Sequence, residues 1–234
     1  MARINKSQLT RLEIIQVASR LFLENGYSNT SVKAISNGLD MSTGNLTFYF
    51  PSKEHLLAVL IHMLCDFQWK MMEKEANEGN SSIMAICLEL MSMAAMCEED
   101  EVAKDIYISS YTSPMSLEII RRNDAQRAKK VFKDYCPDWT DEQFAEAETL
   151  VSGIEYATLM TTSDSASLNT RIAGALDYIL AIYNVPEDLR KKKIQRVLAM
   201  DYRKIGNRVL KEFIKYVEET NENAFNELIH ENKR

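Results

Sequence analysis

The stretch TSVKAISNGLDMSTGNLTFYFPSK, residues 30–53, decides the fold of the N-terminal part of this chain. A short helix is predicted to start near Thr30 or Ser31, because a hydroxyl there can accept hydrogen bonds from the first helical amides. Asp40 marks a turn, since aspartate tolerates a positive φ better than most residues. Ser42 is a favourable N-cap for a second short helix. Two short helices joined by a tight turn form a helix-turn-helix.

The residues on either side of this stretch predict two more helices. Upstream, apolar residues recur at three- and four-residue steps and line one face of a helix that Gly26 ends: Leu12, Ile15, Ala18, Leu21 and Phe22. Downstream, a long helix is expected over residues 52–76. Leu46 and Phe50 are the residues of the second short helix that we expect to be buried.

Several side chains in the second short helix have the chemistry to read DNA, and this helix of a helix-turn-helix enters the major groove. Asn45 can pair in bidentate fashion with adenine, and Thr47 offers a hydroxyl or a methyl group to a thymine. Lys53 begins the next helix, where a cation is unfavourable against the helix dipole unless a phosphate lies nearby. The ring of Phe48 can pack either against a thymine methyl or sugar, or against the protein itself.

These residues resemble the N-terminal domain of the TetR family of transcriptional regulators. The resemblance covers roughly residues 8–60 and rests on a run of shared residues: Ser42, Gly44, Leu46, Tyr49, Phe50, Ser52, Lys53 and Glu54. Asp40 replaces the usual turn glycine, Thr47 a frequent tyrosine and Phe48 a frequent polar residue. The resemblance implies a set of DNA-contacting residues, with Tyr49 and Lys53 on phosphates: Lys33, Ser42, Thr43, Gly44, Asn45, Thr47, Phe48, Tyr49 and Lys53.

Composition predicts an all-α fold, because only 7 glycines and 4 prolines occur among 234 residues. The length allows a small domain and one larger core. We expect a helix-turn-helix DNA-binding domain over residues 1–52 and a helical ligand-binding and dimerisation domain over residues 53–234. The helices expected in the second domain cover 82–97, 100–111, 114–132, 140–161 and 169–183, followed by one that starts at Pro186, has a weak point at Gly206 and frays beyond Val217.

Charge restricts the function further. The net charge of −6 argues against a protein that binds nucleic acid over its whole surface. Residues 1–56 nevertheless carry six basic and four acidic groups, a net of +2, whereas the remainder carries 22 basic and 30 acidic groups, a net of −8. This asymmetry is typical of a basic head on an acidic body.

The cysteines and the N-terminus indicate a compartment. The four cysteines form no CxxC pair, which favours reduced thiols, with a redox-sensing pair as the alternative: Cys65, Cys87, Cys97 and Cys136. The polar N-terminus does not resemble a signal peptide, and no apolar run is long enough to cross a bilayer. We therefore expect a cytoplasmic protein that does not insert into a membrane.

The second domain contains many of the 12 methionines, whose soft side chains line adaptable cavities or fill ordinary cores. If a cavity is present, we expect a small molecule to contact Trp69, Met84, Met91, Tyr107, Tyr111 and Tyr156. His62, Cys65 and Asp66 have a spacing that a metal site can use, yet three mixed ligands on one helical turn are a weak signal. We expect no metal and no cofactor.

The resemblance implies a ligand-responsive repressor that binds a palindromic operator in double-stranded DNA as a homodimer. It also implies a dimer interface made by two late helices, which we assign to residues 141–162 and 169–183. Gly153, Ala157, Ala173 and Gly174 permit close helix approach there. The helix after Pro186 is an addition to this plan, and the alternative to the assigned interface is that this helix shares or replaces it.

Two other classes of protein are compatible with parts of the sequence. A ligand-independent or architectural DNA-binding factor predicts no dry cavity among the methionine-bearing helices. A carrier or an enzyme predicts convergent ionisable residues in a pocket, and the sequence displays no such group. No nucleophile elbow, glycine-rich phosphate loop or HExxH motif occurs either, so we expect no catalytic residues and no enzymatic activity.

Overall fold

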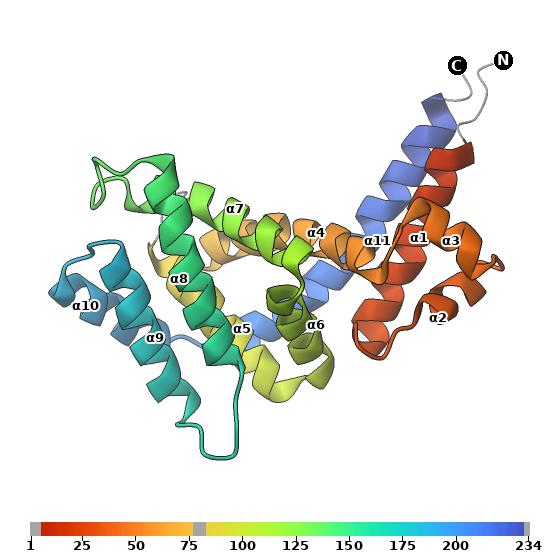
Figure 1. Ribbon diagram of the computed structural model, residues 1–234. Helices are drawn as coiled ribbons and strands as arrows, with labels where there is room; N and C mark the ends of the chain where they lie inside the picture. The colour runs from red at the N-terminus through yellow and green to blue at the C-terminus, as the bar shows by residue number, and fades with distance from the viewer. Residues whose placement is uncertain (1–5, 77–82, 232–234) are drawn as a thin grey trace.

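The computed structural model describes residues 6–76 and 83–231, and all regular secondary structure in these residues is helical (Figure 1). The all-α prediction is therefore confirmed. Within the same residues, no helix is both long and apolar enough to cross a membrane. The described helices are α1 (Lys6–Asn25), α2 (Val32–Asn37), α3 (Thr43–Tyr49), α4 (Lys53–Ala76), α5 (Ile83–Glu99), α6 (Glu101–Thr112), α7 (Pro114–Phe132), α8 (Asp141–Leu159), α9 (Leu168–Ile182), α10 (Glu187–Leu198) and α11 (Tyr202–Glu231).

Helices α1–α3 form the predicted helix-turn-helix, and local residues set its boundaries. The Ser31 hydroxyl accepts a hydrogen bond from the Ala34 amide at 3.0 Å and so caps α2. The turn before α3 contains Asp40 at φ 50°, the left-handed conformation predicted for it. Ser42 caps α3 by accepting from the Asn45 amide at 3.1 Å, which confirms its assignment as N-cap.

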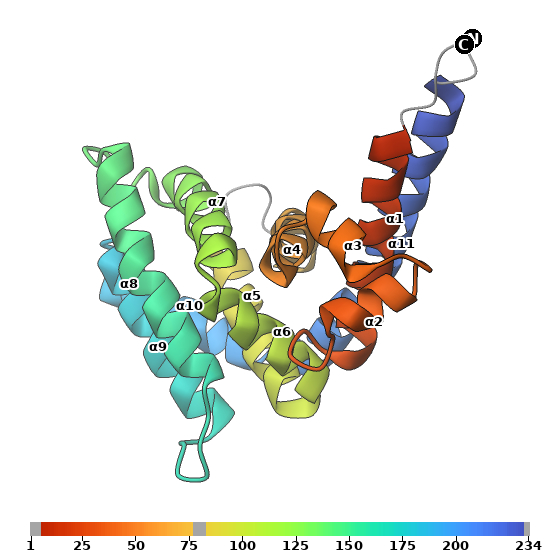
Figure 2. The same ribbon diagram turned by 45° about the vertical axis from the view of Figure 1, so that its right-hand side comes forward.

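The larger helical body is built around α5, whose side chains are almost all buried. Helix α5 lies against α4, α6, α8, α9, α10 and α11, and α7 lies between α4 and α8. Figure 2 shows α1–α3 on one side of this body and α8 and α9 on the opposite side. Met84 and Met91 are among the fully buried residues of α5, so they pack in an ordinary core.

Helices α8 and α9 form an antiparallel pair that exposes large apolar side chains on its outward face. Thr140 and Gln143 form the predicted capping box at the start of α8. Two large apolar side chains on the outward face are exposed, Leu150 by 59% and Tyr178 by 70%. Helix α10 packs against α9 and α5 and leaves both of these side chains uncovered.

The prediction of a single helix after Pro186 with a weak point at Gly206 is wrong. The chain forms two helices, α10 and α11, separated at residues 199–201, and α11 continues unbroken to Glu231 where fraying was expected. Gly206 lies inside α11, where an added Cβ would lie 3.2 Å from the Ser92 carbonyl oxygen and 3.2 Å from Cγ of Met96. This glycine therefore allows α11 to approach α5 closely and does not end a helix.

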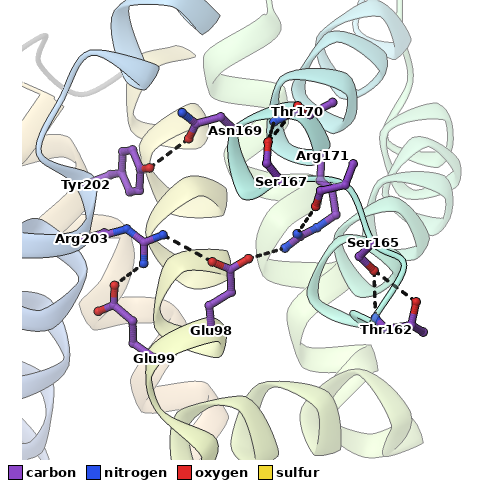
Figure 3. Close-up of polar contacts among 11 residues, drawn as sticks. Glu98, Glu99, Thr162, Ser165, Ser167, Asn169, Thr170, Arg171, Tyr202 and Arg203 are labelled. Carbon is purple, nitrogen blue, oxygen red and sulfur yellow. Dashed lines mark hydrogen bonds and ion pairs between the residues drawn. The ribbon is translucent and has the colours of Figure 1, made fainter.

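Ion pairs hold the start of α11 against the end of α5 (Figure 3). Arg203 pairs with Glu99 and, at 3.4 Å, with Glu98, which also receives a hydrogen bond from Arg171 of α9 at 3.0 Å. From this junction α11 runs beside α1, as Figures 1 and 2 both show. The C-terminal helix thus contacts both the helix-turn-helix and the larger body.

Candidate DNA-binding interface and internal polar cluster

Helix α3 presents most of the predicted DNA-contacting residues to solvent. Its buried side holds Leu46, while the exposed side carries Ser42, Thr43, Gly44, Asn45, Thr47 and Phe48. Phe48 is 80% exposed, so its ring does not pack into the protein core. The Thr47 hydroxyl donates to the Gly44 carbonyl at 3.1 Å, which leaves its methyl group and oxygen lone pairs accessible. DNA contact by these side chains stays a prediction.

Arg11 of α1 stabilises the end of α3, a role that the sequence analysis missed. Its guanidinium donates to the Tyr49 carbonyl at 3.0 Å and lies 4.6 Å from the centre of the Phe50 ring. A cation near the C-terminus of a helix is favourable because the last carbonyls carry partial negative charge. Arg11 is 38 residues from Tyr49 in the chain, so the sequence offered no local signal for this contact.

Lys33 is exposed on α2, as its predicted DNA contact requires, but Lys53 has protein partners. The Lys53 ammonium donates to the carbonyls of Tyr27 at 2.7 Å and Thr30 at 2.9 Å, and it lies 4.0 Å from the centre of the Tyr27 ring. Partial burial lowers the pKa of Lys53, against the opposing effect of Asp105. Two of its three N–H donors therefore hold the turn between α1 and α2, and contact with a phosphate stays a prediction.

Asp105 of α6 connects the larger body to the same turn. Its carboxylate accepts a hydrogen bond from the Ser28 amide at 2.8 Å and a second one from the Ser28 hydroxyl. Gly26 adopts φ 87°, and a Cβ there would lie 2.7 Å from the Asp105 carboxylate. The glycine is thus required both by its backbone conformation and by the close approach of α6.

Five ionisable side chains meet inside the larger body, and we call them the polar cluster: Glu89, Asp124, Arg127, Glu148 and Glu155. Arg127 donates to both oxygens of Glu89 at 3.2 and 3.1 Å and also bonds Asp124. Only 13–15% of each of these three side chains is exposed. The Trp69 ring covers the guanidinium, with 4.8 Å between the Arg127 Cζ and the ring centre.

Tyrosine hydroxyls donate hydrogen bonds to the two remaining carboxyl groups of the polar cluster. Tyr111 donates to Glu155 at 2.8 Å, and Tyr183 donates to Glu148. Burial raises the pKa of Glu148 to about 8, and burial together with the charge of Asp124 also raises the pKa of Glu155. These two acids therefore hold their protons more tightly than exposed glutamates do.

Two small cavities, of about 30 Å³ each, adjoin the polar cluster and share Glu89, Asp124 and Arg127. One is bounded by the side chains around Glu148 and Tyr183, and the other by those around Gln68 and Tyr107. A cavity of this size holds a water molecule when polar groups surround it. The polar cluster therefore lies in a part of the body that contains free space and strong hydrogen-bonding groups.

Some of the predicted ligand-contacting residues lie at or near the two cavities, and others lie in the core. Tyr107 and Tyr111 line one cavity, Trp69 stacks on Arg127, and the Tyr156 ring lies 6.4 Å from that of Tyr111. Met84 and Met91 line neither of the two cavities; both are fully buried in the core around α5. Their role as ligand contacts has no geometric support.

The polar cluster corrects our reading that the sequence holds no convergent ionisable residues. A signal for part of it was present in α8, where Glu148 and Glu155 recur with Phe144 and Val151 at four- and three-residue steps. An acid on the apolar face of a helix is a buried acid, which needs a partner. Nothing in the sequence indicated that these α8 acids would meet the ionisable residues of α5 and α7.

The weak metal candidate near the middle of α4 does not assemble into a site. His62 and Asp66 are exposed and lie 3.7 Å apart, whereas burial raises the pKa of the Cys65 thiol. Among the described residues, no three histidine, cysteine or acidic side chains are grouped so that they could hold a metal ion. Cys87, Cys97 and Cys136 are buried, and none of them forms a disulfide among the described residues.

Comparison with known proteins places the helix-turn-helix in a family. Residues 14–60 match the family model for bacterial regulatory proteins of the tetR family. These residues are thus similar to the TetR family, and we call this part of the chain the TetR-family domain. Within 53 residues, the chain is 42% identical to the HTH-type transcriptional regulator YuxN of Bacillus subtilis (strain 168), an alignment that covers 23% of this chain and 18% of YuxN.

A longer alignment joins the chain to the HTH-type transcriptional regulator HbdR of Aromatoleum sp. (strain CIB). The two are 26% identical over 112 residues, which are 48% of this chain and 48% of HbdR. The chain thus spans less than half the length of these two curated relatives in alignment. Both relatives are transcriptional regulators.

The fold similarity extends well beyond the TetR-family domain. The crystal structure of RolR in complex with resorcinol superposes with a TM-score of 0.65 and 19% identity, covering 83% of this chain and 97% of RolR. RolR without ligand gives a TM-score of 0.57 and 17% identity, covering 79% of this chain and 96% of RolR. The larger body therefore shares its fold with the corresponding part of RolR.

Proposed function

We propose that this protein is a ligand-responsive transcriptional repressor that binds a palindromic DNA operator as a homodimer. The observation that carries the proposal is the TetR-family domain, whose helix α3 exposes Thr43, Asn45 and Thr47. This helix is capped at its start and held at its end by a hydrogen bond from α1. Asparagine and threonine side chains provide hydrogen bonds and methyl contacts that distinguish base pairs in the major groove. We also propose the predicted division into a DNA-binding domain, residues 1–52, and a ligand-binding and dimerisation domain, residues 53–234.

The outward face of α8 and α9 supports dimer formation through residues 141–162 and 169–183. Leu150 and Tyr178 are exposed on this face, and exposed apolar patches mark interaction sites. A Cβ added at Gly153 or Gly174 would meet no atom within 4 Å, so space for a partner helix is available beside both glycines. A two-fold dimer would place two copies of α3 in successive major grooves about 34 Å apart.

Two helices connect the polar cluster to the TetR-family domain and so support control by a ligand. Helix α4 carries Gln68 beside the cluster and Lys53 at the turn between α1 and α2. Helix α6 carries Tyr107 beside the cluster and Asp105 at the same turn. A ligand that displaces either helix would therefore move the DNA-binding domain. RolR, which shares the fold, forms a complex with its ligand resorcinol.

The proposal is tested by fluorescence anisotropy of the purified protein on DNA from directly upstream of its own gene, against a scrambled duplex of equal length. We expect tight, salt-dependent binding to the first duplex only, because phosphate contacts release counterions and base contacts select sequence. If both duplexes bind equally weakly, selection from random DNA follows. Failure of that selection to enrich a palindrome would reject the proposal.

A further inference from the structure

We propose that the polar cluster binds an organic cation with a flat apolar part, such as an amidinium or an aryl-alkyl ammonium ion. The inference concerns binding chemistry, and it rests on the proposed function only in treating this cation as the effector. Among the described residues, four carboxyl groups and one guanidinium make up the cluster, so full ionisation would leave three negative charges without a positive partner.

Buried negative charge is costly in a medium of low dielectric constant unless a cation or a proton compensates it. Arg127 is already paired with Glu89 and Asp124. Glu148 and Glu155 receive only the neutral hydroxyls of Tyr183 and Tyr111, which do not balance a charge. A ligand cation near these two glutamates would supply the missing compensation.

Gln68 provides an independent indication that the cluster accepts a ligand. This side chain is only 3% exposed and lines the cavity next to Arg127. Its carbonyl accepts from Tyr107 at 3.2 Å, but its amide nitrogen Nε2 has no hydrogen-bond partner among the described residues. Buried polar groups are almost always hydrogen-bonded, so a ligand acceptor atom or a water held beside it is expected there.

Aromatic rings surround the same space and suit a flat cation. The rings of Phe132 and Tyr183 are stacked with 4.2 Å between their centres, and both border one cavity. Tyr107 and Tyr111 border the other. Aromatic faces attract cations through their quadrupole, as Trp69 already does for Arg127. Each cavity has a volume of only about 30 Å³, so binding of such a cation requires Glu89, Asp124 and Arg127, which line both cavities, to move apart.

A neutral phenol is the competing ligand class, because its hydroxyls can donate to the same carboxylates. The two classes differ in proton balance: a cation favours ionised Glu148 and Glu155 and so releases protons, whereas a neutral phenol releases none. The ionisable groups that act on these two glutamates are Glu89 of α5, Tyr111 of α6, Asp124 and Arg127 of α7, and Tyr183 after α9.

The experiment is isothermal titration calorimetry of the full chain with matched ligand pairs at pH 7, in phosphate and in Tris buffer. The pairs are benzamidine with benzamide and tyramine with tyrosol, and resorcinol represents the phenols. We expect at least one cation to bind about tenfold or more tightly than its neutral counterpart. We also expect release of about one proton, seen as a difference in heat between the two buffers.

Variants connect the binding to the cluster. Glu155→Gln and Glu148→Gln should each weaken the cation about tenfold and reduce proton release, while Glu146→Gln, on the exposed side of α8, should change neither. Binding of no cation more tightly than its neutral partner, tightest binding of resorcinol, or cation binding unaffected by both glutamine variants would each overturn the inference. The DNA-binding assay is independent, so a protein that binds the cation but no operator would reject the proposed function alone.

Discussion

Several side chains of α3 are available for contact with DNA because they contribute little to the stability of the fold. Asn45 and Phe48 are exposed, and the burial that holds α3 in place comes from Leu46 and Phe50. Lys53 differs, since its ammonium group holds two backbone carbonyls of the turn between α1 and α2. At the residue scale, the predicted interface therefore contains both purely exposed and partly structural members.

Asn45→Ala should relax base preference at one position of each operator half-site, at a cost of about 1–3 kcal/mol, because a bidentate amide contact to a base is removed. The measurement is competition by single-base operator variants in the anisotropy assay. Gln195→Ala, at an exposed position on α10, is the matched control. An unchanged base preference in the Asn45 variant would remove this residue from the base-reading set.

Lys53→Ala should lower both stability and salt dependence. Loss of two hydrogen bonds from a charged donor should cost about 1.5–3 kcal/mol in the free energy of unfolding. Loss of one phosphate contact should reduce the slope of log K against log salt by about one. Lys33→Ala, at an exposed position, should reduce the slope without changing stability. A normal slope with lowered stability would show that Lys53 is structural only.

Glu148 should make the protein less stable as the pH rises. Its pKa in the folded state, about 8, is above the usual value of 4.5, so the folded form binds more protons than the unfolded form between these values. The stabilisation is complete below pH 4.5 and is lost as the pH rises toward 8. Glu148→Gln should flatten this decrease in melting temperature, and Glu146→Gln should preserve it. Parallel curves for wild type and Glu148→Gln would contradict the assignment.

At the scale of elements, α4 and α6 act as two connections between the body and the TetR-family domain. Helix α4 begins with Lys53 at the turn between α1 and α2 and carries Gln68 beside the polar cluster, and α6 carries Asp105 at the same turn and Tyr107 beside the cluster. Helix α11 adds a third contact along α1, and its start is held by Arg203 at the end of α5. Movement of the DNA-binding domain therefore has to be accommodated at several helices at once.

Asp105→Ala should loosen the connection through α6. The amide and hydroxyl of Ser28 would lose their shared acceptor, so the backbone of residues 26–30 should open more often. Hydrogen exchange measured by mass spectrometry should show faster exchange in this segment, with the core of α5 unchanged. Glu101→Ala, at an exposed position on the same helix, should leave exchange as in the wild type. Equal exchange in both variants would mean that the contact does not restrain the turn.

At the scale of the whole molecule, the proposed function requires two copies of α3 at a fixed separation, and the α8–α9 face is the proposed origin of that arrangement. Leu150→Glu should convert the dimer to a monomer, because it places a charge in the centre of an apolar interface. Light scattering after size exclusion measures the mass directly. Ala199→Arg, exposed after α10, should remain dimeric. A dimeric Leu150 variant would move the interface elsewhere.

The features that the sequence predicted correctly depend on neighbours in the chain. Ser31 and Ser42 cap helices through amides three residues away, Asp40 adopts its own turn conformation, and Leu46 is buried through helical periodicity. Such features follow from local hydrogen bonding and steric preference, which the order of residues fixes. For the same reason the sequence already indicated the helix-turn-helix and the all-α class.

Tertiary structure alone decided which distant residues meet. Asp105 bonds Ser28 from 77 residues away, and Arg127 of α7 bonds Glu89 of α5 from 38 residues away. In the sequence Gly206 indicated a weak point in a helix, whereas the structure shows that a glycine at this position allows α11 to approach α5 closely. Contacts of this kind depend on how helices pack against one another, and helical periodicity specifies a buried face without specifying its partner.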